Sequence, residues 1–172
     1  MISRPADSEF LLYYGQYIQL VGDGDVVNSL EKQVGDTLAF LAKIPESRRG
    51  FRYAPDKWSI NEVVGHMIDT ERVMSHRALR FARNDKTPLP GFEQDDYVPA
   101  AKFDDYPLSD LAREFAAVRK ATCYLFRHLS DDASRRTGMA NGAEISVRAL
   151  AYIIAGHELH HRKVLLDRYL TA

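Results

Sequence analysis

The chain has 172 residues, of which 45% are apolar and 27% are charged, and its formal net charge is −1. These values predict one globular domain over residues 1–172, and nothing in them indicates the clustered basic surface that a nucleic-acid-binding protein needs. No apolar run approaches the roughly 20 residues of a membrane-spanning helix, and residues 1–15 lack the apolar core of a signal peptide. We therefore expect a cytoplasmic protein with no nucleic-acid partner and no membrane partner.

Two helices are predicted before residue 45. A short amphipathic segment, residues 9–21, ends at Gly22. A longer helix over residues 27–43 places apolar side chains on one face and stops before Pro45.

Three further long helices follow in the chain. The second long helix, residues 59–83, begins with the letters SINE, which spell a capping box in which Ser59 and Glu62 bond to each other's backbone N–H groups. The third spans about 108–129, directly behind a proline, and the fourth runs from a serine cap at residue 146 to about residue 169.

Two connections are informative. Residues 84–106 form a long crossing with three prolines, which either forms part of a pocket wall or is required by the topology alone. In residues 130–145, the pair Asn141-Gly142 predicts a tight hairpin turn. The fold class is therefore all-α, most simply an antiparallel four-helix bundle with a short N-terminal helix.

The last predicted helix contains the letters H-E-x-x-H, from His157 to His161, a spelling typical of zinc peptidases. These two histidines lie four residues apart on the apolar face of the helix, so both rings point inward one turn apart. Such a pair suits a divalent metal, and the alternative is two hydrogen-bonded core histidines.

The peptidase motif is incomplete, because a zinc peptidase takes its third ligand from residues further along the chain. The 11 residues after His161 contain no histidine or glutamate, and Asp167 lies almost opposite it around the helix. Glu158 remains a weak candidate for a catalytic residue that faces a metal-bound water. The peptidase is consequently the least favoured of the metal-dependent functions.

Three upstream histidines are candidates for the third ligand. His66 fits best, because it lies in the first two turns of its helix on the same face as Glu62 and Asp69. His76 lies among arginines, and His128 closes its helix, where a cation favours the helix dipole. Spacing alone does not decide among them.

Three segments together resemble the DinB superfamily, including its YfiT-like branch. They are WSINEVVGHMIDTE (58–71), LPGFEQDDY (89–97) and SVRALAYIIAGHELHH (146–161), and the resemblance extends over about residues 10–170. It implies an up-down-down-up four-helix bundle that holds a divalent metal with three histidines. By position these are His66, His157 and His161.

The resemblance also implies an activity. Members are described as metal-dependent hydrolases or resemble transferases and isomerases that use a low-molecular-weight thiol, such as bacillithiol, mycothiol or glutathione. We therefore expect a metal-dependent enzyme with a small-molecule substrate, with zinc as the favoured metal and nickel as the next. Glu62 and Asp69 are expected to bond to a ligand histidine or to face the pocket. The alternative is a non-catalytic, metal-stabilised bundle that binds a ligand or partner.

Aromatic residues in the N-terminal segment predict a homodimer, since aromatic side chains are enriched at interfaces. They are Phe10, Tyr13, Tyr14 and Tyr17. The alternative is that these side chains pack on the bundle of their own chain.

Overall fold

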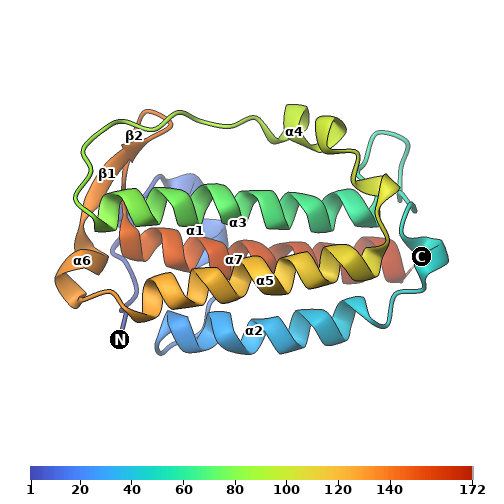
Figure 1. Ribbon diagram of the computed structural model, residues 1–172, viewed down its shortest axis with the longest axis horizontal. Helices are drawn as coiled ribbons and strands as arrows, with labels where there is room; N and C mark the ends of the chain where they lie inside the picture. The colour runs from blue at the N-terminus through green and yellow to red at the C-terminus, as the bar shows by residue number, and fades with distance from the viewer. Residues whose placement is uncertain (172) are drawn as a thin grey trace.

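The computed structural model describes residues 1–171 (Figure 1). Within these residues four long helices form a bundle: α2 (Val26–Leu41), α3 (Ile60–Ala82), α5 (Leu108–Arg127) and α7 (Val147–Val164). Their bounds agree with the predicted helices to within a few residues, except that α7 ends earlier and continues as a π-helical turn over Leu165–Leu170. The all-α four-helix bundle is thereby confirmed.

The long helices follow an up-down-down-up order. In Figure 1, α2 and α7 run in one direction and α3 and α5 run in the other. Helix α3 packs against α5 and α7, and α2 packs against the same two helices. Each helix therefore has one parallel and one antiparallel neighbour, as the up-down-down-up order requires. The cause is the crossing after α3, which returns the chain to the end of the bundle where α3 began.

Serine caps set the starts of α3 and α7, as the sequence predicts. The Ser59 hydroxyl accepts from the backbone N–H of Glu62 at 3.0 Å, and the Glu62 carboxylate accepts from the backbone N–H of Ser59 at 2.8 Å. Ser146 accepts from the N–H of Ala149 at 3.1 Å. These bonds satisfy backbone N–H groups that a helix start would otherwise leave without partners. Ser59 and Ser146 therefore fix where the two histidine-bearing helices begin.

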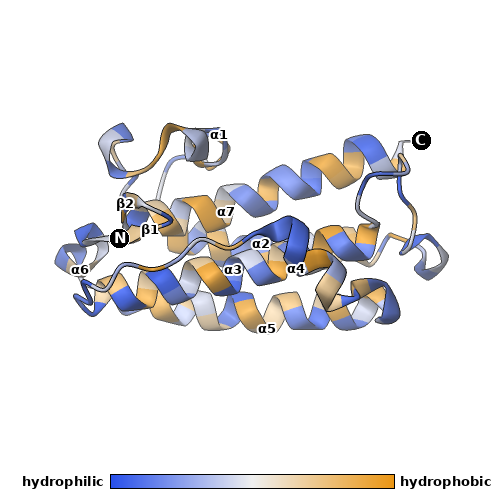
Figure 2. Ribbon diagram, turned by 90° about the horizontal axis from the view of Figure 1, so that it is seen from above, coloured by the Kyte–Doolittle hydropathy of each residue, from blue (hydrophilic) through white to orange (hydrophobic). Residues whose placement is uncertain are grey.

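The N-terminal segment forms less helix than predicted. Its short helix, α1, covers only Gly15–Ile18, and 3₁₀ turns at Asp7–Glu9 and Leu12–Tyr14 precede it. The segment lies along the outer side of α7 (Figure 2). A helix of this length is marginal by itself, so the surface of α7 determines its conformation.

Gly156 makes the close approach of this segment to α7 possible. A Cβ atom at this position would lie 2.0 Å from the backbone oxygen of Tyr17. Only glycine leaves room for the two backbones to meet here. The contact holds Tyr17 against the part of α7 that carries His157 and His160, whose rings lie 5.3 and 5.4 Å from the Tyr17 ring.

The crossing between α3 and α5 contains short helical elements of its own. It contains helix α4 (Gln94–Ala101) and a 3₁₀ turn at Phe103–Asp105. Before α4, the backbone N–H of Leu89 donates to Met139 at 2.9 Å. The crossing is thus attached to the hairpin that follows α5.

A short helix, α6 (Asp131–Arg135), leads into that hairpin, in which β1 (Thr137–Ala140) pairs antiparallel with β2 (Ala143–Ser146). Asn141 and Gly142 form the turn with φ angles of 52° and 74°. Two positive values are typical of a type I′ turn, so the predicted tight turn is present.

Buried polar side chains connect the long helices at the centre of the bundle. The Arg119 guanidinium, fully buried on α5, donates from Nε to both carboxylate oxygens of Glu71 on α3, at 2.8 and 2.9 Å. Its Nη1 donates to Gln33 on α2 at 3.0 Å, and Gln33 donates to the backbone oxygen of Ala155 on α7 at 3.1 Å. All four long helices therefore meet through one buried network.

Figure 2 shows hydrophobic and hydrophilic residues interspersed along the long helices, and most of the buried residues are apolar. Within residues 1–171, no helix combines the length and apolar character needed to cross a membrane.

Candidate metal centre

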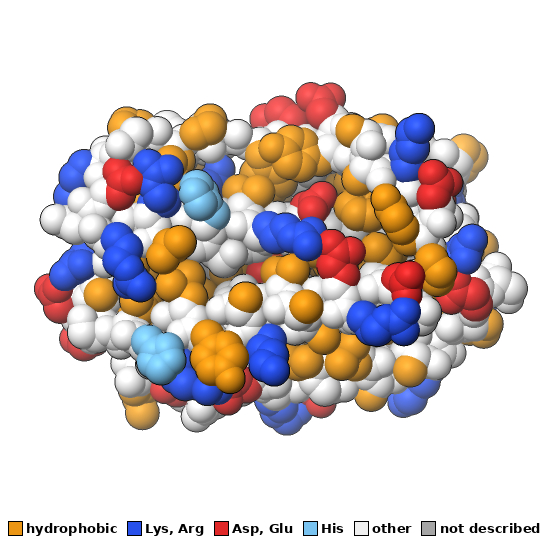
Figure 3. All heavy atoms as spheres, in the orientation of Figure 1, with side chains coloured by type: hydrophobic (Ala, Val, Ile, Leu, Met, Phe, Trp, Pro, Cys, Tyr) orange, Lys and Arg blue, Asp and Glu red, His pale blue; other side chains and the backbone are white. Residues whose placement is uncertain are grey.

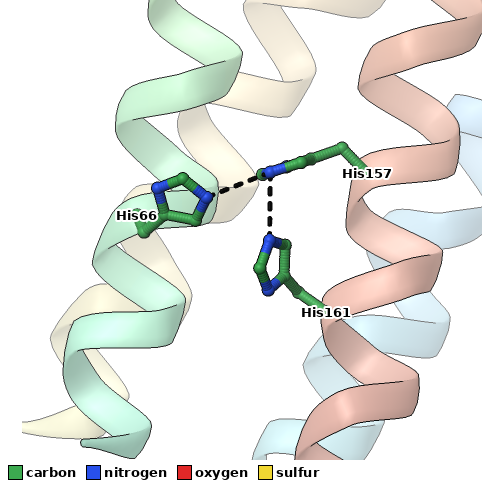
Figure 4. A group of neighbouring side chains, drawn as sticks. All are labelled: His66, His157 and His161. Carbon is green, nitrogen blue, oxygen red and sulfur yellow. Dashed lines mark hydrogen bonds between the residues drawn. The ribbon is translucent and has the colours of Figure 1, made fainter. Parts of the chain in front are cut away.

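Three histidines from two neighbouring helices meet inside the bundle (Figure 4). His66 belongs to α3, and His157 and His161 lie one turn apart on α7. The Nε2 atom of His157 lies 3.0 Å from the Nε2 atom of His66 and 3.0 Å from that of His161. One ligand atom from each of the three lies within 4.8 Å of the others, so a single ion could contact all three.

Aromatic neighbours restrict the orientation of the rings. The Trp58 ring lies against His66, with centroids 4.8 Å apart, and the Tyr17 ring meets His157 edge-on. On the other side of His66, the Thr70 hydroxyl lies 3.4 Å from Nδ1. A proton on Nδ1 would point at that hydroxyl, which leaves the lone pair of His66 on the Nε2 atom that faces the other histidines.

The arrangement of the Nε2 atoms fits a cation better than hydrogen bonding among the rings. A ring nitrogen carries either one proton or one lone pair in the ring plane, so His157 Nε2 cannot donate to one neighbour while it accepts from the other. Three lone pairs directed at one cation satisfy all three nitrogens together. The donor set therefore fits a divalent metal that accepts imidazole ligands, such as zinc.

Burial keeps these rings uncharged. Desolvation, and to a lesser extent the nearby His160, lower the pKa of His66 to about 4. Burial first, and then neighbouring histidines, place the pKa of His157 and that of His161 well below the usual value. At neutral pH all three rings are therefore neutral and able to bind a metal.

A cavity of about 260 Å³ reaches His66 and His157. The described residues provide no fourth histidine, cysteine or carboxylate in the histidine group, so the protein leaves one side of it open. The remaining walls come from five parts of the chain: Tyr13, Tyr14 and Tyr17 from the N-terminal segment, Thr70 and Met74 from α3, Phe92, Glu93, Gln94 and Asp95 from the crossing, Asn141 from the hairpin, and Ile153 from α7. The crossing thus forms part of a pocket wall, one of the two roles expected for it.

Glu62 and Asp69, expected beside the histidines, bond elsewhere. The Glu62 carboxylate is used in the capping box with Ser59 and in an ion pair with Arg52. Asp69 forms an ion pair with Arg72 at 3.5 Å. Neither carboxylate belongs to the histidine group or to the cavity lining. The structure therefore does not support the predicted roles of these two residues.

Glu158 also points away from the predicted position. Its carboxylate accepts from the Thr37 hydroxyl of α2 and lies 3.3 Å from Arg162. Adjacent residues on a helix differ by about 100° in direction, so a histidine that faces α3 turns its neighbour toward α2. The glutamate of the H-E-x-x-H letters is therefore buried between α7 and α2 and does not line the cavity.

Sequence reasoning missed the aromatic and hydroxyl neighbours of the site. Thr70 lies four residues after His66, so the helix period could have found it. Trp58 precedes the cap of the same helix. For Tyr17, the sequence offers no signal, because its place depends on the approach of the N-terminal segment to Gly156.

A family model described as the DinB superfamily matches residues 29–165 of the chain. The chain belongs to the DinB superfamily. This membership confirms the resemblance of the three sequence segments, and it agrees with the up-down-down-up order of the helices.

Solved structures share the DinB fold at low sequence identity. YfiT from Bacillus subtilis, described as a probable metal-dependent hydrolase with an unusual four-helix bundle topology, has a TM-score of 0.71 at 14% identity, covering 97% of this chain and 91% of YfiT. The DinB-like protein YjoA from Bacillus subtilis has a TM-score of 0.63 at 17% identity, covering 86% of this chain and 91% of YjoA.

A third similar structure, a mycothiol-dependent maleylpyruvate isomerase, has a TM-score of 0.67 at 10% identity. The match covers 85% of this chain but only 61% of the isomerase. No curated protein matches the chain in a sequence comparison. At such identities, the structural similarities show the shared DinB fold alone.

Proposed function

We propose that this DinB protein is a metal-dependent enzyme that acts on a small molecule, with His66, His157 and His161 as the metal ligands. The observation that carries the proposal is the open side of the histidine group, which faces a cavity instead of a fourth protein ligand among residues 1–171. Three protein ligands and one open position are typical of catalytic zinc sites, whereas structural sites are closed by four. The same observation argues against a non-catalytic, metal-stabilised bundle.

A divalent metal at this site would lower the pKa of a coordinated water or thiol toward neutrality. The protein's own contribution is to supply three neutral nitrogens, which leave the charge of the metal uncompensated. The Thr70 hydroxyl is placed to accept a hydrogen bond from Nδ1 of His66, and the Trp58 and Tyr17 rings pack against His66 and His157. Zinc is our first choice of metal and nickel the second, because both accept imidazole ligands.

Hydrolysis is the reaction class that the cavity supports best. Its volume of about 260 Å³ lies just below the roughly 300 to 1,000 Å³ usual for ligand pockets. A substrate and water fit such a volume more readily than a substrate and a low-molecular-weight thiol. The description of YfiT as a probable metal-dependent hydrolase agrees with this choice, and the mycothiol-dependent isomerase keeps thiol transfer as the alternative.

Metal binding is tested first, by competitive titration of tag-free protein against a chromophoric chelator. His66→Ala removes one of three ligands, so the metal affinity should fall by more than the roughly 10–100-fold that is typical of changes around the ligands. The controls are His76→Ala and His128→Ala, which remove histidines outside the group and should change the affinity little. Affinity near that of the wild type in His66→Ala would refute the assignment of the site.

The reaction class is tested next, with zinc- and nickel-loaded protein and a panel of small esters and amides. Turnover should require metal, should be lost in His66→Ala, and should not require added thiol. Turnover only in the presence of mycothiol, bacillithiol or glutathione would identify a thiol transferase instead. Full occupancy by metal with no exchangeable coordination position would indicate the non-catalytic alternative.

We also propose a homodimer, now on a smaller surface than the sequence suggested. Phe10 and Tyr17 are buried in their own chain, whereas Leu12 and Tyr13 are 82% and 63% exposed. Light scattering over a dilution series should give the dimer mass, and Leu12→Ser/Tyr13→Ser should shift the protein toward the monomer. A monomer at every concentration would contradict the dimer.

A further inference from the structure

The outer end of the cavity carries free acidic groups. Glu93 and Asp95, on the first turn of α4, line the cavity and are exposed. Within residues 1–171 neither carboxylate forms an ion pair or a side-chain hydrogen bond, and Glu93 does not cap α4 although it holds the cap position. Figure 3 shows acidic side chains gathered at the upper edge of the molecule, where α4 lies in Figure 1. These carboxylates are therefore available to a ligand.

The walls between this rim and the histidines are largely aromatic. Tyr13, Tyr14, Tyr17 and Phe92 all line the cavity. The faces of such rings attract cations, and several rings beside carboxylates form the environment that proteins use to bind ammonium groups. The lining of the cavity contains no lysine or arginine among the described residues.

One arginine lies close by but outside the cavity. The Arg77 guanidinium lies behind Phe92, 5.9 Å from its ring centroid, and donates from Nη2 to the backbone oxygen of Pro90 at 2.8 Å. Arg77 is buried and contributes to a neighbouring hollow beneath residues 89–92. Its side chain holds the crossing in place and contacts the Tyr14 hydroxyl and the Met74 sulfur, which line the cavity, but Arg77 itself is not part of the lining.

We propose that the substrate carries a positively charged nitrogen, held between the aromatic walls and the carboxylates of Glu93 and Asp95, at the end remote from the group that reaches the histidines. This inference rests on the proposed function, since it takes the histidine group as the reactive end of the cavity. It specifies the substrate class as a small cationic amine or quaternary ammonium compound whose neutral polar group approaches His66 and His157.

Three matched benzohydroxamates test the inference with the zinc-loaded protein. The hydroxamate binds zinc, and the para position carries an aminomethyl, an ethyl or a carboxylate group. We expect the aminomethyl compound to bind about tenfold more tightly than the carboxylate compound in a calorimetric titration, since exposed ion pairs and cation–π contacts each contribute about two- to fivefold. Glu93→Gln/Asp95→Asn should reduce this preference to about twofold or less.

The matched control is Asp110→Asn/Asp132→Asn, which makes the same change of charge at exposed carboxylates on α5 and α6 and should retain the preference. Equal binding of all three compounds, or tightest binding of the carboxylate, would overturn this inference and leave the proposed function intact. If no hydroxamate binds although chelator titration shows zinc in place, the open coordination position is refuted, and the inference is overturned with it.

Discussion

Burial determines the ionisation of the three histidines. Each ring has lost most of its solvent, and each has another imidazole beside it, so protonation is disfavoured twice. From the unperturbed histidine pKa of about 6.5, metal would be expected to leave near pH 6.5. Since burial lowers the pKa of His66 to about 4, protons compete for this nitrogen only at a lower pH.

The same burial makes the stability of the metal-free protein depend on pH. Between about pH 6.5 and pH 4 the unfolded chain binds a proton at residue 66, whereas the folded chain does not. Stability therefore falls as the pH falls through this range, and His66 alone contributes about 3 kcal/mol to the loss. Urea unfolding with a chelator present measures the slope. His66→Ala should be less sensitive to pH than the wild type, and parallel slopes would contradict the shift.

The local part of the site could be predicted from the sequence, and the long-range part only incompletely. His157 and His161 share a helix face, so their spacing sufficed to place them together. His66 is 91 residues away from His157. The predicted helix faces favoured it as the third ligand over His76 and His128 but did not decide among them. The H-E-x-x-H letters suggested that Glu158 faces a metal-bound water, but its carboxylate accepts a hydrogen bond from Thr37 on α2.

The contact between α7 and the N-terminal segment depends on one missing side chain. Gly156→Ala would place a methyl group 2.0 Å from the Tyr17 backbone oxygen, and the segment would have to move. We expect a loss of about 1–3 kcal/mol in the free energy of unfolding, although alanine favours helix by about 1 kcal/mol. Chemical denaturation measures this change.

Gly35→Ala on α2 is the matched control, because a Cβ atom there meets nothing within 4 Å. Helix propensity alone should then stabilise the protein by up to about 1 kcal/mol. Opposite signs for the two substitutions are the expected result. If Gly156→Ala is also stabilising, the close approach of the segment to α7 is refuted.

Elements with local signals were predicted well. Ser59, Ser146 and the pair Asn141-Gly142 act through bonds and backbone angles within a few residues, so their sequence is sufficient. Residues 9–21 and helix α4 depend on surfaces formed by distant parts of the chain. Their hydrophobic pattern could not show that the first would be mostly turns or that the second would be helical.

At the scale of the whole molecule, the Arg119 network holds the four long helices in register. Arg119→Met should cost about 3 kcal/mol or more, because Glu71 is left as a buried charge without its partner. The melting temperature should drop by about 10 °C for a chain of this length. Calorimetry measures the drop.

The double variant Glu71→Leu/Arg119→Met is the control for that prediction. It removes both charges together, so it should recover much of the stability lost in Arg119→Met. Equal melting temperatures for the wild type and Arg119→Met would show that the ion pair does not contribute to the fold.

The up-down-down-up order has a consequence for how such a protein can change over evolutionary time. Because α3 and α5 are parallel, the crossing that joins them must run the length of the bundle. On its way it lines the cavity with Phe92 and Asp95. The histidines, by contrast, are anchored on helices that pack directly against each other. Replacing the crossing would exchange one wall of the cavity for another while the three histidines stay in place, so a single scaffold could be adapted to many compounds.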